Sequence, residues 1–359
     1  MRSVALLTSS FWLLLFISSC HNNEPCTTCP PSGPDTTSHS FNFTQYTFGG
    51  TGGSSNFNDV AILADTLVIA VGEVYLTDST GQVDDQPYSI AKWNGTAWSL
   101  ERLYDLQNNL IPNVRGVLAL SASDIWLADG GVYHWNGVFP QVDKSFDRIS
   151  LIGGVENGQS INRVWGLTSK DIFGVGYAGM VAHYDGFTWT KLESGTTIDL
   201  RDVWGSSDGS VVWASGWSND EGTSVLLGYD GKSWETVWRR DGSASVSPFG
   251  TFVTSEWGDS PVYFATGRAV FRVGQQDTVS VASLPWFPYR IRGSAGNNIA
   301  LAGDEGMIWH FNGATWKDLN EHAGQPLYSI AVSQNLIVAV GVETAIGFGA
   351  ALIYMGRRQ

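Results

Sequence analysis

Residues 171 to 189 read DIFGVGYAGMVAHYDGFTW and contain the unit from which most of the chain is built. A short apolar strand ends at Gly176, a second ends at Tyr184-Asp185-Gly186, and Trp189 follows three residues later. Apolar stretches closed by a glycine recur along the chain, at Gly72, Gly130, Gly176, Gly216, Gly267, Gly303 and Gly341. Seven copies of a four-stranded unit are typical of a β-propeller, in which each copy forms one blade.

The third unit gives the strand order expected for every blade. We predict its strands at residues 161–167, 171–176, 180–184 and 188–193, numbered one to four from the central channel outward. The other complete units fit the same order and begin at Phe57, at Asn113, at Asp199, near Phe249 and at Tyr289.

The seventh unit is incomplete, with strands expected at 327–333, 337–341 and 350–355 before the chain ends. Residues 44–49 precede the first unit as residues 190–195 precede the fourth, so we expect this N-terminal segment to supply the missing outer strand. Closure of this kind removes exposed strand edges. The predicted fold class is therefore all-β: a seven-bladed propeller of four-stranded antiparallel blades, the last blade closed by the N-terminal strand (3+1).

The turn between the third and fourth strands carries the most regular motif. Asn-Gly or Asp-Gly is followed by a tryptophan three residues after the glycine, at Asn94 to Trp98, Asp185 to Trp189, Asp230 to Trp234 and Asn312 to Trp316. These dipeptides tolerate the positive φ of tight hairpins. An aromatic residue that recurs once per blade is more typical of packing between blades than of a sugar site.

This turn resembles that of the Asp-box propellers, the sialidase-like and photosystem-assembly-factor-like families, although it is shorter and lacks their leading serine. The resemblance covers most of residues 41 to 355. It implies a propeller fold and marks a structural turn rather than a site. The Trp-Asp pair of WD repeats does not occur in the sequence.

The N-terminus has the features of an export signal. Residues 1–19 contain Arg2, an apolar run too short to span a bilayer, and small residues before Cys20. Ile17 to Cys20 resemble the lipobox of bacterial lipoproteins, which implies a lipid on Cys20; His21 after it favours the outer membrane. Residues 20–40 are expected to be a flexible tether, followed by a single propeller domain over 41–359. Cys26 and Cys29 favour a local disulfide over a metal site with His21 and His39.

Composition excludes one class of partner. The chain has 20 basic against 34 acidic residues, a net charge of −14, and no run of Lys or Arg that would give a nucleic acid a basic face. We expect a monomer with no cofactor, whose partners are the membrane, through the lipid, and an envelope protein or glycan.

Long connections are expected on one face of the disc. In an antiparallel blade the turns between strands 1 and 2 and between strands 3 and 4 share a face, and the other connections share the opposite one. The second set holds the insertions at 73–87, 145–160, 217–223, 239–247 and 342–349. Variable loops on a rigid scaffold are where binding sites are usually built, whereas drift is the alternative because surface loops lengthen at little cost.

The first strands begin on this long-loop face and bring polar residues into register. We single out Asp59, Arg115, Arg163, Arg201, Asp202, Tyr289, Arg290 and Tyr328. These residues either hydrate the channel and pair between blades, or form an anion or carboxylate site, for which the arginine fork is well suited.

Three functions remain open from the sequence. A binding or scaffolding module is favoured over an enzyme, because no nucleophile, metal cluster or phosphate loop stands out and because His134, His183 and His310 occupy one repeat position. The alternative is a sialidase-like glycoside hydrolase that uses an arginine cluster and a tyrosine nucleophile. A calcium-dependent adhesin would use acidic loops at Asp78, Asp84, Asp85 or Asp220-Glu221, which lack an ordered ligand spacing.

Overall fold

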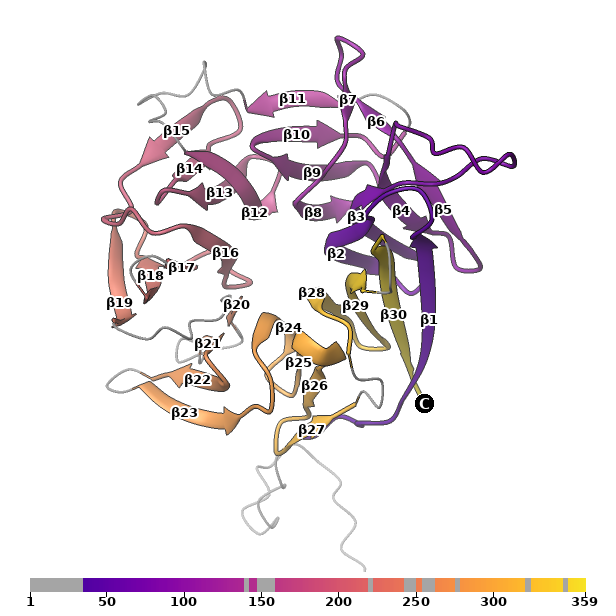
Figure 1. Ribbon diagram of the computed structural model, residues 1–359. Coiled ribbons are helices and arrows are strands. Elements are labelled where there is room, and N and C mark those ends of the chain that lie inside the picture. Colours follow the sequence, from indigo (N-terminus) through magenta and orange to yellow (C-terminus); the bar gives the residue numbers. More distant parts are fainter. Residues whose placement is uncertain are drawn as a thin grey trace, which may run out of the picture. The chain divides into compact units, whose positions relative to one another are not determined.

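Seven small sheets stand around a central channel (Figure 1). The computed structural model describes residues 35–138, 142–146, 159–218, 222–241, 250–253, 262–274, 278–319, 324–344 and 348–359. Its contacts divide the chain after Asp35, and residues 36–359 form one compact unit. Each sheet has four antiparallel strands, which confirms the predicted seven-bladed propeller.

The blades follow one another along the chain. Blade 1 comprises β2 (Asn56–Ala64), β3 (Leu67–Val74), β4 (Tyr88–Trp93) and β5 (Trp98–Glu101); blade 2 β8 (Gly116–Ser121), β9 (Asp124–Asp129), β10 (Gly131–Trp135) and β11 (Asp143–Phe146); blade 3 β12 (Ser160–Thr168), β13 (Asp171–Tyr177), β14 (Val181–Tyr184) and β15 (Trp189–Leu192). Blade 4 comprises β16 (Leu200–Gly205), β17 (Val212–Ser218), β18 (Thr223–Tyr229) and β19 (Trp234–Arg240); blade 5 β20 (Gly250–Val253), β21 (Val262–Thr266), β22 (Ala269–Val273) and β23 (Thr278–Ser283); blade 6 β24 (Pro288–Ala295), β25 (Asn298–Gly303), β26 (Ile308–Phe311) and β27 (Trp316–Asp318). A hairpin of β6 (Leu103–Tyr104) and β7 (Leu110–Ile111) lies between blades 1 and 2, and the 3-10 turn η1 (Asp304–Gly306) lies between β25 and β26.

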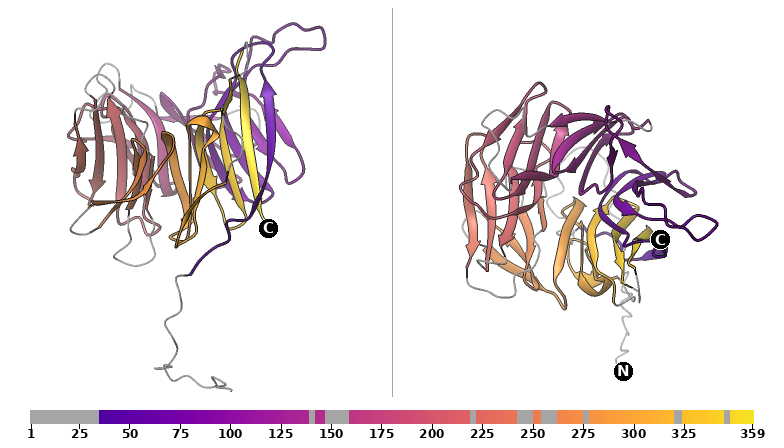
Figure 2. Two further views of the ribbon diagram at one scale, coloured as in Figure 1. Left: turned by 60° about the horizontal axis from the view of Figure 1, so that its bottom comes forward. Right: turned by 45° about the horizontal axis from the view of Figure 1, so that its top comes forward.

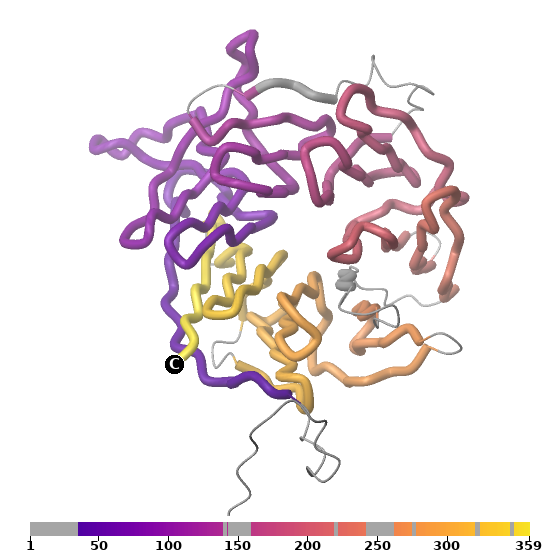
Figure 3. The backbone as a smooth tube through the Cα atoms, turned by 180° about the vertical axis from the view of Figure 1, so that it is seen from behind, coloured from indigo at the N-terminus to yellow at the C-terminus, as the bar shows by residue number. Residues whose placement is uncertain are grey.

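The last blade joins the two ends of the propeller. β28 (Leu327–Val332), β29 (Leu336–Glu343) and β30 (Ala350–Arg358) are followed in the sheet by β1 (Phe41–Gly49). β1 pairs with β30 from Phe41 opposite Arg358 to Gly49 opposite Ala350, and the two strands lie side by side in Figures 2 and 3. The predicted 3+1 closure is confirmed.

The core is divided among the interfaces between blades. Buried apolar side chains of the described residues form seven clusters, each drawn from two adjacent blades. The turn tryptophans take part in these interfaces: the ring of Trp189 lies 6.5 Å from that of Trp126 in the preceding blade, and the ring of Trp234 lies 6.2 Å from that of Phe173. Because a blade cannot bury its two faces alone, the ring is stable only when the neighbouring blades pack together.

The repeated turn has the same geometry in all four copies. Its first residue accepts two backbone N–H groups through Oδ1: Asp185 accepts them from Phe187 and Thr188 at 2.9 and 2.8 Å. The following glycine has a φ of +93° in this copy, a conformation that a side chain would strain. The motif is therefore a structural turn, as predicted.

The glycine at the end of the second strand is required by a different feature, a close contact with the neighbouring backbone. A Cβ at Gly176 would lie 1.8 Å from the carbonyl oxygen of Ser160, at the start of the first strand of the same blade. The same close approach to a backbone oxygen occurs at Gly72, Gly216, Gly303 and Gly341. At these five positions the sequence repeat records a contact between strands 1 and 2 that leaves no room for a side chain.

The distribution of long connections differs from the prediction in one blade. Residues 75–87, within the predicted insertion 73–87, connect strands 2 and 3 on the long-loop face as expected, and the segment with β6 and β7, which the prediction did not include, is a second long connection on that face. However, β20 and β21 are strands 1 and 2 of blade 5, and eight residues separate them in the sequence where a short turn was expected. The expectation that every long insertion shares one face is wrong there. Parts of the other predicted insertions lie outside the described residues: 147–158 of 145–160, 219–221 of 217–223, 242–247 of 239–247 and 345–347 of 342–349.

Candidate functional site at the channel mouth

A β-bulge at the start of the first strand places the polar residues of the repeat. In blades 1, 3, 4, 6 and 7 the pairing of strand 1 with strand 2 skips one residue. The skipped residues are Asn58, Asn162, Arg201, Tyr289 and Tyr328. Each is followed by a second residue that pairs one step further along the strand, namely Asp59, Arg163, Asp202, Arg290 and Ser329. Bulges re-aim side chains in this way at functional edges of sheets.

A cavity of about 220 Å³ opens where these strands begin, and we call it the mouth pocket. It is lined by Asn58, Asn113, Arg115, Asn162, Arg163, Tyr177, Leu200 and Arg201. Three of the four predicted arginines therefore meet in one pocket.

Tyr177, at the end of β13, organises two of these arginines. Its hydroxyl lies 2.5 Å from Nη1 of Arg115, and the guanidinium of Arg201 lies 5.0 Å from its ring centroid. Each arginine also has an acidic neighbour: Asp129 lies 3.5 Å from Nε of Arg115, and Asp199 accepts from Nη2 of Arg201 at 2.9 Å. Both arginine side chains remain more than a third exposed, so these ion pairs are weak and open to exchange.

Arg163 forms the wall between the mouth pocket and the channel behind it. Its Nη1 donates to the carbonyl oxygens of Arg115 and Asn162, while its Nε is buried without a partner. Burial of the guanidinium away from water lowers the pKa of Arg163 to about 10, and the positive charge of Arg290 acts in the same direction. The side chain stays protonated at neutral pH and carries its charge into the channel.

Arg290 does not join the mouth pocket, contrary to the prediction that four arginines ring the mouth. Its side chain is 3% exposed and forms an ion pair with Asp202, which is fully buried. Arg292, which the prediction missed, donates to the two oxygens of the same carboxylate at 2.8 and 2.7 Å. Asp202 therefore holds two arginines inside the channel wall. The signal that could have found Arg292 is its position two residues after Arg290, on the same side of the strand.

Asp59 is also a buried structural group. Its Oδ1 accepts from the Ser329 hydroxyl at 2.6 Å and its Oδ2 from the Val117 amide at 3.1 Å, so it joins blades 7, 1 and 2. The interpretation that the channel residues pair between blades is correct for Asp59 and Asp202.

Tyr289 and Tyr328 form a separate aromatic pair in blades 6 and 7. Their ring centroids lie 5.6 Å apart with the planes at 87°. Burial raises the pKa of both hydroxyls, and a hydrogen bond with Asp304 raises that of Tyr289 further. A tyrosine nucleophile needs the opposite shift. Together with the pairing of Arg290, this geometry gives the glycosidase alternative no support.

The acidic loops considered as calcium sites do not form a set of ligands within the described residues. Asp78 accepts hydrogen bonds from Thr80 and Gln82 within its own loop, and Asp84 is paired with Arg102. Within the described ranges, no group of three or more His, Cys, Asp or Glu side chains could hold a metal ion, and no helix could span a membrane. Cys20, Cys26, Cys29 and Asp220-Glu221 lie outside the described residues.

The fold has counterparts among solved structures. The structure of YCF48 bound to D1 peptide superposes with a TM-score of 0.60 at 13% identity, covering 90% of this chain and 99% of that one. The chain shares the β-propeller fold. The WD40 β-propeller domain of Doa1 gives a TM-score of 0.58 at 11% identity, covering 88% and 97%. The computationally designed Ika8 protein gives 0.50 at 15%, covering 87% and 100%.

No protein-family model and no curated protein matches this sequence. At these low identities the structural likeness establishes the architecture and leaves function to the site itself.

Proposed function

We propose that this protein is a non-catalytic binding or scaffolding module of the cell envelope, which holds a carboxylate-bearing segment of a partner protein at the mouth pocket. The observation that carries the proposal is the cluster of Arg115, Tyr177 and Arg201, whose arginines are oriented and still partly exposed. Arginine presents paired N–H groups that match a carboxylate. The long loops of the same face supply surface for the rest of such a segment.

The exchange of partners at this cluster costs little. Arg115 and Arg201 already face Asp129 and Asp199, and an incoming carboxylate replaces one exposed ion pair with another of the same chemistry. The structure of YCF48 with a bound peptide supports the choice of a protein segment as the ligand of a propeller.

Location in the envelope rests on the first twenty residues. A lipid on Cys20 and the tether up to residue 40 would hold the propeller at the outer membrane, where protein or glycan partners are available. Incorporation of labelled palmitate that persists in a Cys20→Ala variant would refute this anchor.

Fluorescence anisotropy with labelled peptides tests the binding site. Each acidic peptide is paired with a counterpart in which Asn and Gln replace Asp and Glu and the terminal carboxylate is amidated. We expect the acidic member to bind more tightly, and the double variant Arg115→Gln/Arg201→Gln to lose that preference.

A matched control separates the site from net charge. Arg240→Gln/Arg272→Gln removes the same charge from two exposed side chains on the outer strands of blades 4 and 5 and should leave the preference intact. Equal losses in the two double variants, or equal binding of both peptides to the unmodified protein, would refute the mouth pocket as the site.

A further inference from the structure

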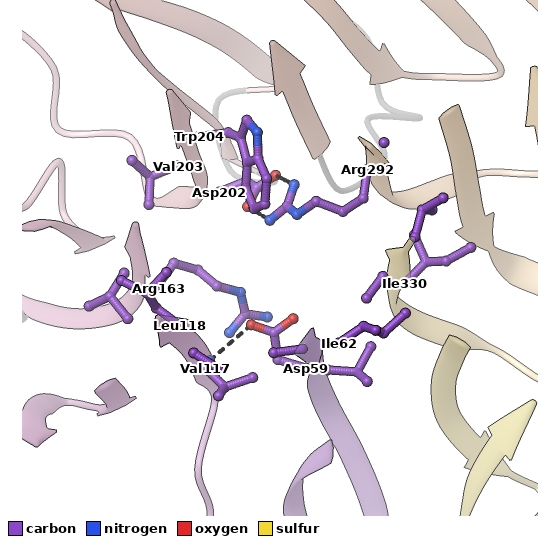
Figure 4. A pocket seen from close by; sticks show the side chains of 17 residues that line it. Asp59, Ile62, Val117, Leu118, Arg163, Asp202, Val203, Trp204, Arg292 and Ile330 are labelled. Atoms are coloured by element: carbon purple, nitrogen blue, oxygen red, sulfur yellow. Dashed lines mark hydrogen bonds and ion pairs between the residues drawn. The ribbon is translucent and has the colours of Figure 1, made fainter. Parts of the chain in front are cut away.

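A second cavity lies inside the channel, behind Arg163, and we call it the channel cavity. It encloses about 150 Å³ (Figure 4). Its charged lining consists of Asp59, Arg163, Asp202 and Arg292. This cavity is distinct from the mouth pocket, with which it shares Arg163.

The walls become apolar toward the short-turn face of the disc. Following the first strands away from the mouth, the lining changes to Ile62, Leu118, Ala119, Ala331 and Val332. These side chains are partly exposed rather than buried, so solvent reaches this end of the cavity. A ligand can therefore enter from the face opposite the mouth pocket.

The charges around this cavity do not balance among the described residues. Arg163, Arg290 and Arg292 contribute three positive charges against the two carboxylates of Asp59 and Asp202. Asp202 is paired with Arg290 and Arg292. Asp59 accepts from Ser329 and Val117 rather than from an arginine. The charges of Asp59 and Asp202 also favour protonated Arg163, so the excess is one positive charge shared by the three arginines, and Arg163 is the one of them that lines the cavity without a carboxylate hydrogen-bonded to it among the described residues.

We propose that the channel cavity binds a small monocarboxylate with an apolar body, its carboxylate at Arg163 and its body against Ile62, Leu118 and Ala331. One negative charge balances the site, and a carboxylate is an anion that matches the paired N–H groups of a guanidinium. A neutral or cationic ligand leaves the excess positive charge of the site without a counter-charge, and a dianion brings one negative charge more than the site balances. This inference stands apart from the proposed function, because it uses a different cavity and the opposite face.

The volume of the channel cavity limits the size of the apolar part of the ligand. An apolar protein cavity of about 150 Å³ accommodates a molecule such as benzene. A single aromatic ring or a short branched chain therefore fills the channel cavity, whereas a long acyl chain exceeds it.

Isothermal titration calorimetry of the purified full chain tests the proposal, with benzoate as the probe. Benzyl alcohol keeps the ring without the charge, and acetate keeps the charge without the ring. We expect benzoate to bind at least about tenfold more tightly than either. Equal affinity for benzoate and benzyl alcohol, equal affinity for benzoate and acetate, or no binding of benzoate would overturn the proposal.

Three variants locate the binding. Arg163→Met removes the charge at similar side-chain length, and Ala331→Phe fills the apolar end without touching any charge; each should weaken benzoate binding at least about tenfold. Arg115→Met alters the mouth pocket alone and should change it less than about twofold. Loss of binding in Arg115→Met with retention in Ala331→Phe would place the anion at the mouth and overturn the proposal. Ala331→Phe decides the matter alone if Arg163→Met does not fold.

Discussion

Acidification from pH 7 to pH 5 should destabilise the propeller through His310 on β26. Its side chain is fully buried. The ring accepts from His39, with 2.8 Å between the two Nδ1 atoms, and its Nε2 donates to Oδ1 of Asn298 at 2.9 Å. His39 Nε2 lies 3.1 Å from the Thr315 hydroxyl oxygen. Only one proton fits between the two Nδ1 atoms, so the hydrogen bonds do not allow both rings to be protonated at once.

An exchange of one residue in the repeat explains why His310 differs from its counterparts. His134 and His183 occupy the same position in blades 2 and 3, and each contacts a carboxylate at the start of the second strand, Asp124 or Asp171. In blade 6 that position is Asn298. The amide cannot stabilise an imidazolium as a carboxylate does.

The size of the effect follows from the pKa of the imidazole. Burial lowers the pKa of His310 from 6.5 to about 3, and the charges of His39 and Arg358 act in the same direction. The unfolded chain takes up this proton near pH 6.5 whereas the folded chain stays neutral, so the stabilisation is complete above pH 6.5 and is lost as the pH falls toward 3. Between pH 7 and pH 5 the free energy of unfolding should fall by about 2 kcal/mol. The pKa of His39 is lowered too, by burial and by Lys317 and Arg358, which adds to the loss.

Urea unfolding at pH 5, 6 and 7 measures this loss. The His310→Gln variant should lose most of the pH dependence, whatever its stability at pH 7. Asn298→Asp should also reduce it, because a carboxylate beside His310 raises the pKa of the imidazole. His183→Gln, at the same repeat position in blade 3, serves as the control and should retain the dependence. A pH slope that is unchanged in His310→Gln would refute the reasoning.

Two further predictions concern the construction of the ring. Asp202→Asn leaves Arg290 and Arg292 without their carboxylate in the channel wall, so the free energy of unfolding should fall by about 3–5 kcal/mol. The control Asp199→Asn, at the exposed pair with Arg201, should lower it by less than about 1 kcal/mol. Equal losses for the two variants in urea unfolding would contradict the burial assigned to Asp202. Deletion of residues 41–49 removes β1 and exposes β30, so the thermal unfolding midpoint should fall sharply; a midpoint equal to that of the full chain would show that β1 does not close the ring.

The repeat and its turns could be predicted because their causes are local. The Asp185-Gly186 turn is fixed by hydrogen bonds across three residues, and Gly176 is required by a contact within its own blade. The alternation of such signals gave the strand order, and the missing fourth strand of the last unit indicated the closure by β1.

The candidate site was predicted only as a set of positions. Register along the first strands brought Arg115, Arg163 and Arg201 to the mouth, as the structure bears out. The same register could not distinguish Arg290, whose partner Asp202 lies in a blade that is not adjacent in the sequence. Tyr177, which orients two of the arginines, is the last residue of β13 and directly follows the closing Gly176. Because the residue at this position differs from blade to blade, the repeat does not mark it.

The sequence by itself determined the number of blades and their turns, because these depend on contacts within one blade. It also indicated the closure of the ring, because the last unit lacks a strand that the N-terminal segment can supply, although β1 and β30 meet from opposite ends of the propeller. Only the tertiary structure decided which charged side chains pair with one another between blades and which remain available to a ligand. Asp202 meets Arg292 across 90 positions of the chain, and Asp59 meets Ser329 across 270. Such contacts form when the ring closes and the first strands of distant blades face one channel. Ring closure therefore makes Asp59 and Asp202 structural, and it leaves one positive charge in excess around the channel, with Arg163 between the two cavities.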